Sequence, residues 1–241
     1  MSTKVARIYK HNRINRANFG NFEFTDYKVF LMLIKEAMCG KSINTNLDIN
    51  NIDLVYTITA KDYSDIFGTP LQHCYEILDK SRVKLVETYI NVEEISKTKR
   101  RGGRMSINVC SSAEYKDGKL FARFTKEFLP FLILFGSSFM SYNIKQVGDF
   151  NSIYTTRLFE LLQEFKDTGR MIKSIEQLKD CLAVAVDKKY KHLKADIIDP
   201  AVKDINKNTD LNLQYQEIKQ GRKTSALDCT FNQQQLKEQV F

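Results

Sequence analysis

Basic residues gather at three places in this chain where they could bind the phosphates of a nucleic acid. The first is S-K-T-K-R-R-G-G-R at residues 96–104, which contains two adjacent glycines. Its basic residues are Lys97, Lys99, Arg100, Arg101 and Arg104. Lys and Arg neutralise phosphates, and glycines let a loop lie close to a surface. The pattern favours a DNA-contacting loop, and a solvated loop that only confers solubility is the alternative.

A second basic stretch, K-Q-G-R-K at residues 219–223, separates two segments in which apolar and polar residues alternate. Its basic residues are Lys219, Arg222 and Lys223. Gly221 stands where the tip of a hairpin needs unusual backbone angles. We therefore expect a second basic hairpin tip, with an ordinary polar tip as the alternative.

A third basic group surrounds the start of a helix predicted over residues 190–206. It consists of Lys188, Lys189, Lys191, His192 and Lys194. A recognition helix offers its N-terminal residues to base edges in the major groove of DNA, so this group is a candidate for reading sequence. Lys203 and Lys207 lie farther along among aspartates, where a solvated helix face is the competing interpretation.

Residues that could catalyse a reaction are not grouped in the sequence. His11, His73 and His192 are far apart, which is unlike the spacing of metal ligands. No Gly-rich phosphate loop and no Gly-x-Ser-x-Gly motif is found. One of the eleven tyrosines could act as a DNA-nicking nucleophile, but that chemistry also needs a metal held by clustered histidines. We expect a non-enzymatic protein without a metal or a cofactor.

Composition limits the class of protein and of partner. A length of 241 residues suits one large domain or two small ones, and 43% hydrophobic with 27% charged residues excludes a disordered tail protein. A net charge of +8 favours a polyanionic partner. The longest apolar run, Phe128–Phe135, is shorter than the roughly 20 residues of a membrane span and predicts a buried helix instead.

The cysteines and the start of the chain bear on the compartment. Five widely spaced cysteines without a CxxC motif favour a reducing environment over a disulfide or zinc framework. The first residues are basic and lack the apolar stretch of a signal peptide. We therefore expect a cytoplasmic protein that does not contact membranes.

Helical and strand patterns place the first basic loop in a recognisable order. After a helix at 25–39, Thr59 can cap a short helix that ends at Gly68, and Pro70 opens another with an apolar face expected to be Leu71, Cys74, Tyr75 and Leu78. Strands at 90–92 and 105–109 flank the basic loop, and a strand at 120–124 follows the turn signal Asp117-Gly118. A helix-turn-helix followed by a hairpin with a basic tip is the layout of a winged helix.

The second half repeats this order. A helix at 151–165 has its apolar face at Tyr154, Leu158, Leu161, Leu162 and Phe165, and within it Arg157 is expected to be structural. Ser174 and Gln177 form a capping box, and Pro200 kinks or restarts the helix over 190–206, whose core face is expected to be Ala195, Ile198, Val202 and Ile205. A hairpin follows, with Leu211, Leu213 and Tyr215 on one strand and Leu227, Cys229 and Phe231 on the other.

These elements predict an α+β fold of two tandem winged-helix domains, mainly helical with small antiparallel β-hairpin wings. The expected limits are a basic N-terminal arm at 1–24, one winged helix at 25–138, a second at 139–232 and a Gln-rich tail at 233–241.

The second half also resembles a known family. The block S-I-Y-T-T-R-L-F-E-L-L at residues 152–162 resembles the Ser-x-Tyr-x-x-Arg-Leu-Tyr-Glu-Leu-Leu block of plasmid replication initiator proteins. The segments D-P-A-V-K-D-I-N at 199–206 and K-Q-G-R-K at 219–223 fit the same family. The resemblance covers residues 142–231 well and residues 25–135 more loosely, through Y-T-I-T-A-K-D-Y at 56–63.

This resemblance implies a sequence-specific DNA-binding protein that initiates theta-type plasmid replication. Such proteins bind direct repeats (iterons) in double-stranded DNA at the origin, help to open the duplex and recruit the host replication initiator and the replicative helicase. Many repress their own promoter as dimers and initiate as monomers, so self-association as a dimer is expected. The chain departs from the family pattern before Ile197-Ile198, where Ala195 and Asp196 replace basic residues.

Three other functions compete with this interpretation. A tandem winged-helix transcriptional regulator would share the fold without supporting autonomous replication. A rolling-circle nickase would nick supercoiled origin DNA in the presence of a divalent metal. A protein-interaction module would not shift duplex DNA in a gel.

Overall fold

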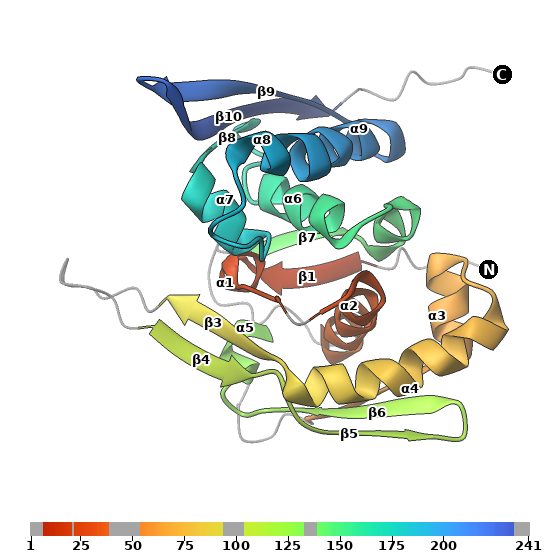
Figure 1. The fold of residues 1–241 in the computed structure, drawn as a ribbon. Helices are drawn as coiled ribbons and strands as arrows, with labels where there is room; N and C mark the ends of the chain where they lie inside the picture. The colour runs from red at the N-terminus through yellow and green to blue at the C-terminus, as the bar shows by residue number, and fades with distance from the viewer. Residues whose placement is uncertain (1–6, 21, 39–53, 94–103, 133–138, 234–241) are drawn as a thin grey trace, which may run out of the picture. The chain divides into compact units, whose positions relative to one another are not determined.

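The structure is a computed structural model that describes residues 7–20, 22–38, 54–93, 104–132 and 139–233 (Figure 1). The chain divides into two compact units, Met1–Gly148 and Asp149–Phe241. The division lies after residue 148, whereas the sequence analysis expected it after 138. The structure does not test the predicted limits of the functional domains, and these stay a prediction.

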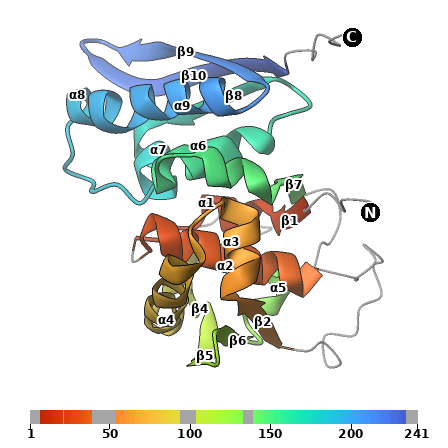
Figure 2. The ribbon, with the colours of Figure 1, turned by 90° about the vertical axis from the view of Figure 1, so that its right-hand side faces the viewer.

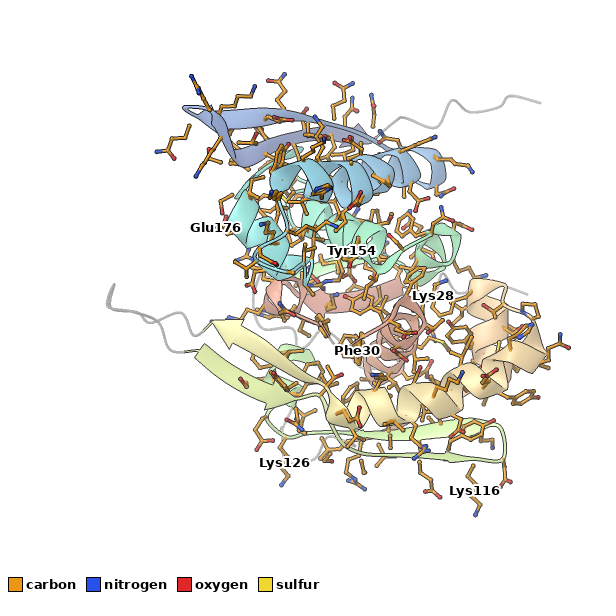
Figure 3. All side chains as sticks on the ribbon, in the orientation of Figure 1. Lys28, Phe30, Lys116, Lys126, Tyr154 and Glu176 are labelled. Atoms are coloured by element: carbon orange, nitrogen blue, oxygen red, sulfur yellow. The ribbon has the colours of Figure 1, made fainter. Side chains whose placement is uncertain are left out.

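The first unit is built around helix α2. Its elements are β1 (Arg7–His11), α1 (Asn12–Arg16), α2 (Phe24–Met38), β2 (Val55–Thr59), α3 (Ala60–Phe67), α4 (Leu71–Glu87), β3 (Tyr89–Glu93), β4 (Arg104–Asn108), β5 (Cys110–Lys116), β6 (Lys119–Phe124), α5 (Leu129–Leu132), β7 (Phe139–Asn143) and the 3₁₀ helix η2 (Ile144–Asp149). Phe30 of α2 is fully buried and packs against the rings of Phe19, Phe22 and Phe128 (Figure 3). These four phenylalanines therefore belong to the core of the first unit.

Helices α3 and α4 form the predicted helix-turn-helix. The Thr59 side chain accepts from the Asp62 amide, and the Asp62 carboxylate accepts from the Thr59 amide, each at 3.0 Å. Gly68 ends α3 with a φ of 67°, a left-handed conformation that glycine adopts without strain. Buried Ser81 of α4 donates to the Asp26 carboxylate of α2 at 2.7 Å, which joins the two helices.

The apolar face predicted for α4 is only partly correct. Cys74 and Leu78 are buried, but Leu71 and Tyr75 are 43% and 44% exposed. The ring of Tyr75 lies against Gly118, where a Cβ atom would come within 3.1 Å of it. Tyr75 therefore covers the β5–β6 turn from the side of α4 instead of entering the core.

Two small antiparallel sheets accompany the helix-turn-helix of this unit. Strands β2, β6 and β5 form a sheet in that order, and the β5–β6 turn contains Asp117 and Gly118, both with positive φ. Strands β3 and β4 pair from Tyr89 opposite Asn108 to Glu93 opposite Arg104. The predicted strands flanking the basic loop are thus confirmed, and the loop at 94–103 lies outside the described residues.

The N-terminal segment is a correction to the expected basic arm. Residues 7–11 form β1, which pairs antiparallel with β7 within the first unit. Ile8 and Lys10 are both buried, and the Lys10 ammonium donates to the Tyr27 hydroxyl at 2.8 Å. The sequence analysis missed this strand because its basic residues hide the alternation of buried and exposed positions. A lysine can occupy a buried position when its aliphatic chain is packed and its ammonium group has a hydrogen-bond partner.

The second unit is a three-stranded sheet packed on helices. Its elements are α6 (Ile153–Gln163), β8 (Arg170–Ser174), α7 (Ile175–Cys181), α8 (Tyr190–Leu193), the π-helix η3 (Lys194–Ile198), α9 (Asp199–Asn208), β9 (Leu211–Gln220) and β10 (Lys223–Gln233). The strand order is β8-β10-β9, all antiparallel. Helices α8 and α9 lie between the β9–β10 hairpin and α6 (Figures 1 and 2). The second winged-helix order is therefore present, with β8 as a strand that the sequence analysis did not predict.

Capping and glycine signals in this unit are confirmed. Ser174 accepts from the Gln177 amide and the Gln177 side chain accepts from the Ser174 amide, both at 3.1 Å. Gly169 has a φ of 65°, and a Cβ atom there would lie 2.7 Å from the Phe231 carbonyl oxygen. Only glycine therefore fits between α6 and strand β10.

Helix α6 is buried on more sides than predicted. All residues from Thr155 to Leu162 are buried, whereas Tyr154 and Phe165 of the predicted apolar face are partly exposed. Arg157 is 2% exposed and donates from Nε and Nη2 to the Cys181 carbonyl at 3.3 and 3.1 Å. Its predicted structural position is confirmed.

The helix predicted over 190–206 is interrupted by a π turn. The Asp199 amide donates to the Lys194 carbonyl five residues earlier, and Pro200 follows at once. Proline has no N–H to continue the α-helical pattern, and the wider π turn accommodates it. The extra residue rotates the preceding turn, so Leu193 and Ile197 face the core and Ala195 of the predicted face is exposed. We call the continuous segment α8–η3–α9 the recognition helix.

Among the described residues, no helix is both long enough and apolar enough to cross a membrane.

Candidate nucleic-acid interface

The tip of the β9–β10 hairpin presents the predicted basic residues to solvent. Gln220 pairs with Lys223, which leaves Gly221 and Arg222 as a two-residue turn, with Gly221 at a φ of 63°. Lys219, Arg222 and Lys223 are all exposed. Side chains project from this end of the hairpin (Figure 3). The sequence analysis thus placed all three correctly, and we call Lys219, Arg222 and Lys223 the wing tip.

The start of the recognition helix carries five predicted basic residues, and the structure separates them into two kinds. Lys189, Lys191 and His192 are exposed, and none of them forms an ion pair with another described residue. Lys188 is paired with Asp196 at 2.8 Å, and Lys194 is paired with Glu217 of β9 at 2.7 Å. The first three are therefore available to a polyanion, whereas the other two already have a carboxylate partner.

Glu217 is a carboxylate that the sequence analysis did not single out. Its Oε1 accepts from Lys194, and its Oε2 accepts from the Thr224 hydroxyl of β10 at 3.0 Å. Lys194 and, next, the Tyr190 hydroxyl lower the pKa of Glu217 to about 2. Because Tyr215 and Glu217 are two residues apart on β9, the alternation of the strand places both on the same face, and this spacing was readable in the sequence.

A second contact joins the recognition helix to the same strand. The Tyr215 hydroxyl donates to the Asp199 carboxylate at the start of α9. Burial, followed by the hydrogen bond to Asp199, raises the pKa of Tyr215, so the hydroxyl keeps its proton. Three acidic residues at or beside the recognition helix therefore have partners: Asp196 with Lys188, Asp199 with Tyr215 and Glu217 with Lys194.

The first basic loop lies largely outside the described residues. Lys97, Lys99, Arg100 and Arg101 are in the range 94–103, and Arg104 is the first residue of β4. Their role as phosphate contacts stays a prediction.

Helix α4, the second helix of the helix-turn-helix in the first unit, has a mixed surface. Lys80 pairs with Glu76 at 2.6 Å, and Arg82 pairs with Asp79 at 3.2 Å. Side-chain exposures between 40% and 74% place all four at the surface, so each cation is offset by an acid beside it. Lys80 and Arg82 of α4 are therefore less available to a polyanion than Lys189, Lys191 and His192 at the start of the recognition helix.

Groups that could do chemistry are dispersed in the structure. No three His, Cys, Asp or Glu side chains among the described residues are close enough to hold a metal ion. His11 caps α1, where its Nδ1 accepts from the Arg13 amide at 3.1 Å. Burial raises the pKa of Cys110 and Cys229 to about 12, so these thiols stay protonated.

Two family profiles and two curated proteins match this chain. The family profile described as "Initiator Replication protein, WH1" matches residues 7–163, and the profile described as "Initiator Rep protein, WH2" matches residues 174–231. A replication initiation protein of Escherichia coli is 22% identical over 221 residues, which cover 89% of this chain and 67% of that protein. An uncharacterized 27.6 kDa protein of the same organism is 30% identical over 94 residues, and the chain spans 39% of its length.

A solved structure has the same fold along almost the whole chain. The crystal structure of the Pi initiator protein in complex with iteron DNA superimposes with a TM-score of 0.74 at 18% identity, and it covers 95% of this chain and 98% of that one. Together with the two matched profiles, this likeness confirms the predicted α+β fold of two winged helices.

Proposed function

Because the chain belongs to the family of initiator replication proteins with WH1 and WH2 domains, we propose that it initiates plasmid replication by binding iterons in double-stranded DNA at the origin. The membership confirms the resemblance found in the sequence and the expected class, an initiator rather than an enzyme. A protein with this function works in the cytoplasm, where the plasmid is.

The observation that supports DNA binding most directly is the basic surface of the second unit. Lys189, Lys191 and His192 are exposed at the start of the recognition helix, and the wing tip is exposed on the hairpin packed beside it. Lys and His can donate to guanine acceptors in the major groove, whereas wing contacts to phosphates give affinity without discrimination. We assign base reading to Lys191 and His192 and phosphate contacts to Lys189 and the wing tip, whereas Lys188 stays paired with Asp196.

The first basic loop supplies the proposed contact of the first unit. Lys97, Lys99, Arg100, Arg101 and Arg104 would neutralise backbone phosphates beside the repeat. The family also supports recruitment of the host initiator and the replicative helicase, repression of the gene's own promoter and self-association as a dimer. Each of these finer activities is part of the proposal.

The decisive experiment uses the DNA that flanks the gene. We expect tandem repeats of about 20 base pairs, roughly two helical turns each, and autonomous replication of a plasmid that carries the gene with them. Deleting the repeats should abolish replication and the gel shift. Repeat binding without replication would identify a transcriptional regulator, nicks in supercoiled origin DNA would identify a nickase, and no shift would identify a protein-interaction module.

A further inference from the structure

We propose that Lys194 does not read bases but holds the recognition helix against the wing through Glu217, so that the two DNA-contacting elements keep one relative geometry before DNA is bound. This inference rests on the proposed function. It assigns Lys194 and Glu217 as positioning residues.

The helix–wing contact is a group of side chains from both elements rather than a single ion pair. Lys194 and Asp199 come from the recognition helix, and Tyr215, Glu217 and Thr224 come from the hairpin. Lys194 Nζ lies 2.7 Å from Glu217 Oε1, Thr224 donates to Oε2 at 3.0 Å, and Tyr215 donates to Asp199. The Lys194 ammonium also lies 5.8 Å from the centre of the Tyr215 ring. The helix is thus attached to β9 at both ends of the π turn.

The π turn explains why both attachments reach one strand. In a regular α-helix, residues five apart differ in direction by about 140°, which would turn Lys194 and Asp199 away from each other. In η3 the hydrogen bond runs from the Asp199 amide to the Lys194 carbonyl, so the two residues lie above one another. The alternation of β9 places their partners, Glu217 and Tyr215, side by side.

Charge also disfavours a direct base contact by Lys194. The Glu217 side chain is 23% exposed, and it lies on the hairpin that carries the wing tip. If Lys194 left Glu217 for a base, an unpaired carboxylate would face the phosphates of the DNA. Keeping the pair avoids this repulsion, and a fixed geometry reduces the ordering that binding must impose.

The test exchanges the two charges in the full-length protein. The affinity for the flanking repeat is divided by the affinity for a scrambled duplex at one salt concentration, in Lys194→Glu, in Glu217→Lys and in the double variant. We expect each single variant to lower this ratio by about tenfold or more and the double variant to return within about threefold of the wild type, since the exchange restores the pair. A double variant as poor as Lys194→Glu would show that Lys194 itself contacts DNA, and unchanged single variants would show that the pair positions nothing. Either result overturns the inference.

A matched control comes from the same sheet. Asp228 of β10 pairs with Arg170 of β8 through two hydrogen bonds of 2.9 and 2.6 Å. Asp228→Asn removes one negative charge from the same sheet but leaves the helix–wing contact intact. We expect Asp228→Asn to change both affinities by the same factor, so that the ratio stays constant.

A measurement without DNA separates this inference from the proposed function. In the free protein, the Glu217 carboxyl should titrate with a pKa of about 2, and Lys194→Met should move this pKa toward 4.5. Carbon-detected nuclear magnetic resonance of the Glu217 side chain follows both. If the wild type shows no preference for any repeat, the proposed function fails, and this titration still decides whether the Lys194–Glu217 pair forms. A pKa near 4.5 in the wild type would overturn the pair itself.

Discussion

At the residue scale, the Arg157–Glu160 and Lys194–Glu217 ion pairs have different roles because they lie in different surroundings. Arg157 and Glu160 are both buried in α6, with Nη1 3.3 Å from Oε2, and the arginine also holds the Cys181 carbonyl. Glu217, by contrast, is partly exposed and joins two elements. Position in the fold, and not residue type, separates a structural ion pair from one that bears on binding.

We expect Arg157→Ala to destabilise the protein by about 3–5 kcal/mol, because it removes the cation from a fully buried carboxylate. Urea unfolding measures the change. Arg170→Ala, which removes an arginine whose side chain is 58% exposed, is the control and should change the stability much less, because an ion pair in contact with solvent contributes little. An unchanged melting temperature combined with lost repeat binding would contradict the structural role of Arg157.

Glu217 predicts a dependence of stability on pH. Its pKa is lowered from 4.5 to about 2 in the folded protein, so folding favours the ionised form. The stabilisation is fully present above pH 4.5 and is lost as pH falls through 2. At pH 7 we expect the wild type to have a higher melting temperature than Glu217→Gln. This difference in melting temperature should disappear as the pH falls from 4.5 to 2. A difference that does not vary with pH would exclude an ionic contribution from Glu217.

At the element scale, the hairpin and the recognition helix divide the proposed work. The two-residue turn at Gly221 and Arg222 leaves the wing tip exposed beyond the last strand pair. In the recognition helix, the exposed basic residues precede the π turn. Lys194, the first residue of that turn, is paired with Glu217. Affinity and sequence discrimination are therefore expected to be separable by mutation.

Replacing Lys219, Arg222 and Lys223 of the wing tip with glutamine should reduce affinity for specific and scrambled duplexes equally. Each phosphate that is no longer neutralised should reduce the magnitude of the negative slope of log K against log salt by about 0.9. Binding measured by fluorescence anisotropy at several salt concentrations gives both quantities. A loss of discrimination, with an unchanged slope, would move base reading from the recognition helix to the wing.

At the scale of the whole molecule, two units of the same kind carry different surfaces. The second unit has an exposed basic cluster at the start of the recognition helix, whereas Lys80 and Arg82 of α4 in the first unit are paired with acids. The proposed contact of the first unit with DNA is the basic loop at residues 97–104. Because this loop and the wing tip belong to different units, their contributions should be independent.

We therefore expect additive salt effects. Neutralising Lys97, Lys99, Arg100, Arg101 and Arg104 should reduce the magnitude of the slope of log K against log salt by about 0.9 for each phosphate that the loop neutralises in the wild type. Combining this variant with the wing-tip variant should reduce the magnitude of this slope by the sum of the two effects. Urea unfolding of each variant confirms that folding is intact. An unchanged slope for the loop variant would show that the loop does not touch DNA.

The sequence by itself determined the order of elements, because local signals mark their ends. Thr59 with Asp62, Ser174 with Gln177, Gly68 and Asp117-Gly118 act within a few residues, and all of them occupy the positions expected. The exposed wing tip followed from the same reasoning, since a glycine turn between alternating strands leaves its flanking residues in solvent.

Only the tertiary structure decided which charges are available and which faces are buried. Lys191 and Lys194 have the same charge and similar sequence surroundings, yet Lys194 meets Glu217, which lies 23 residues away in the sequence. Lys10 is buried because β1 pairs with β7, a strand that follows more than a hundred residues later in the sequence. The π turn before Pro200 rotates the helix face by one residue. Each outcome depends on partners distant in sequence or on a local change of helical period, and a residue pattern read at 3.6 residues per turn contains neither.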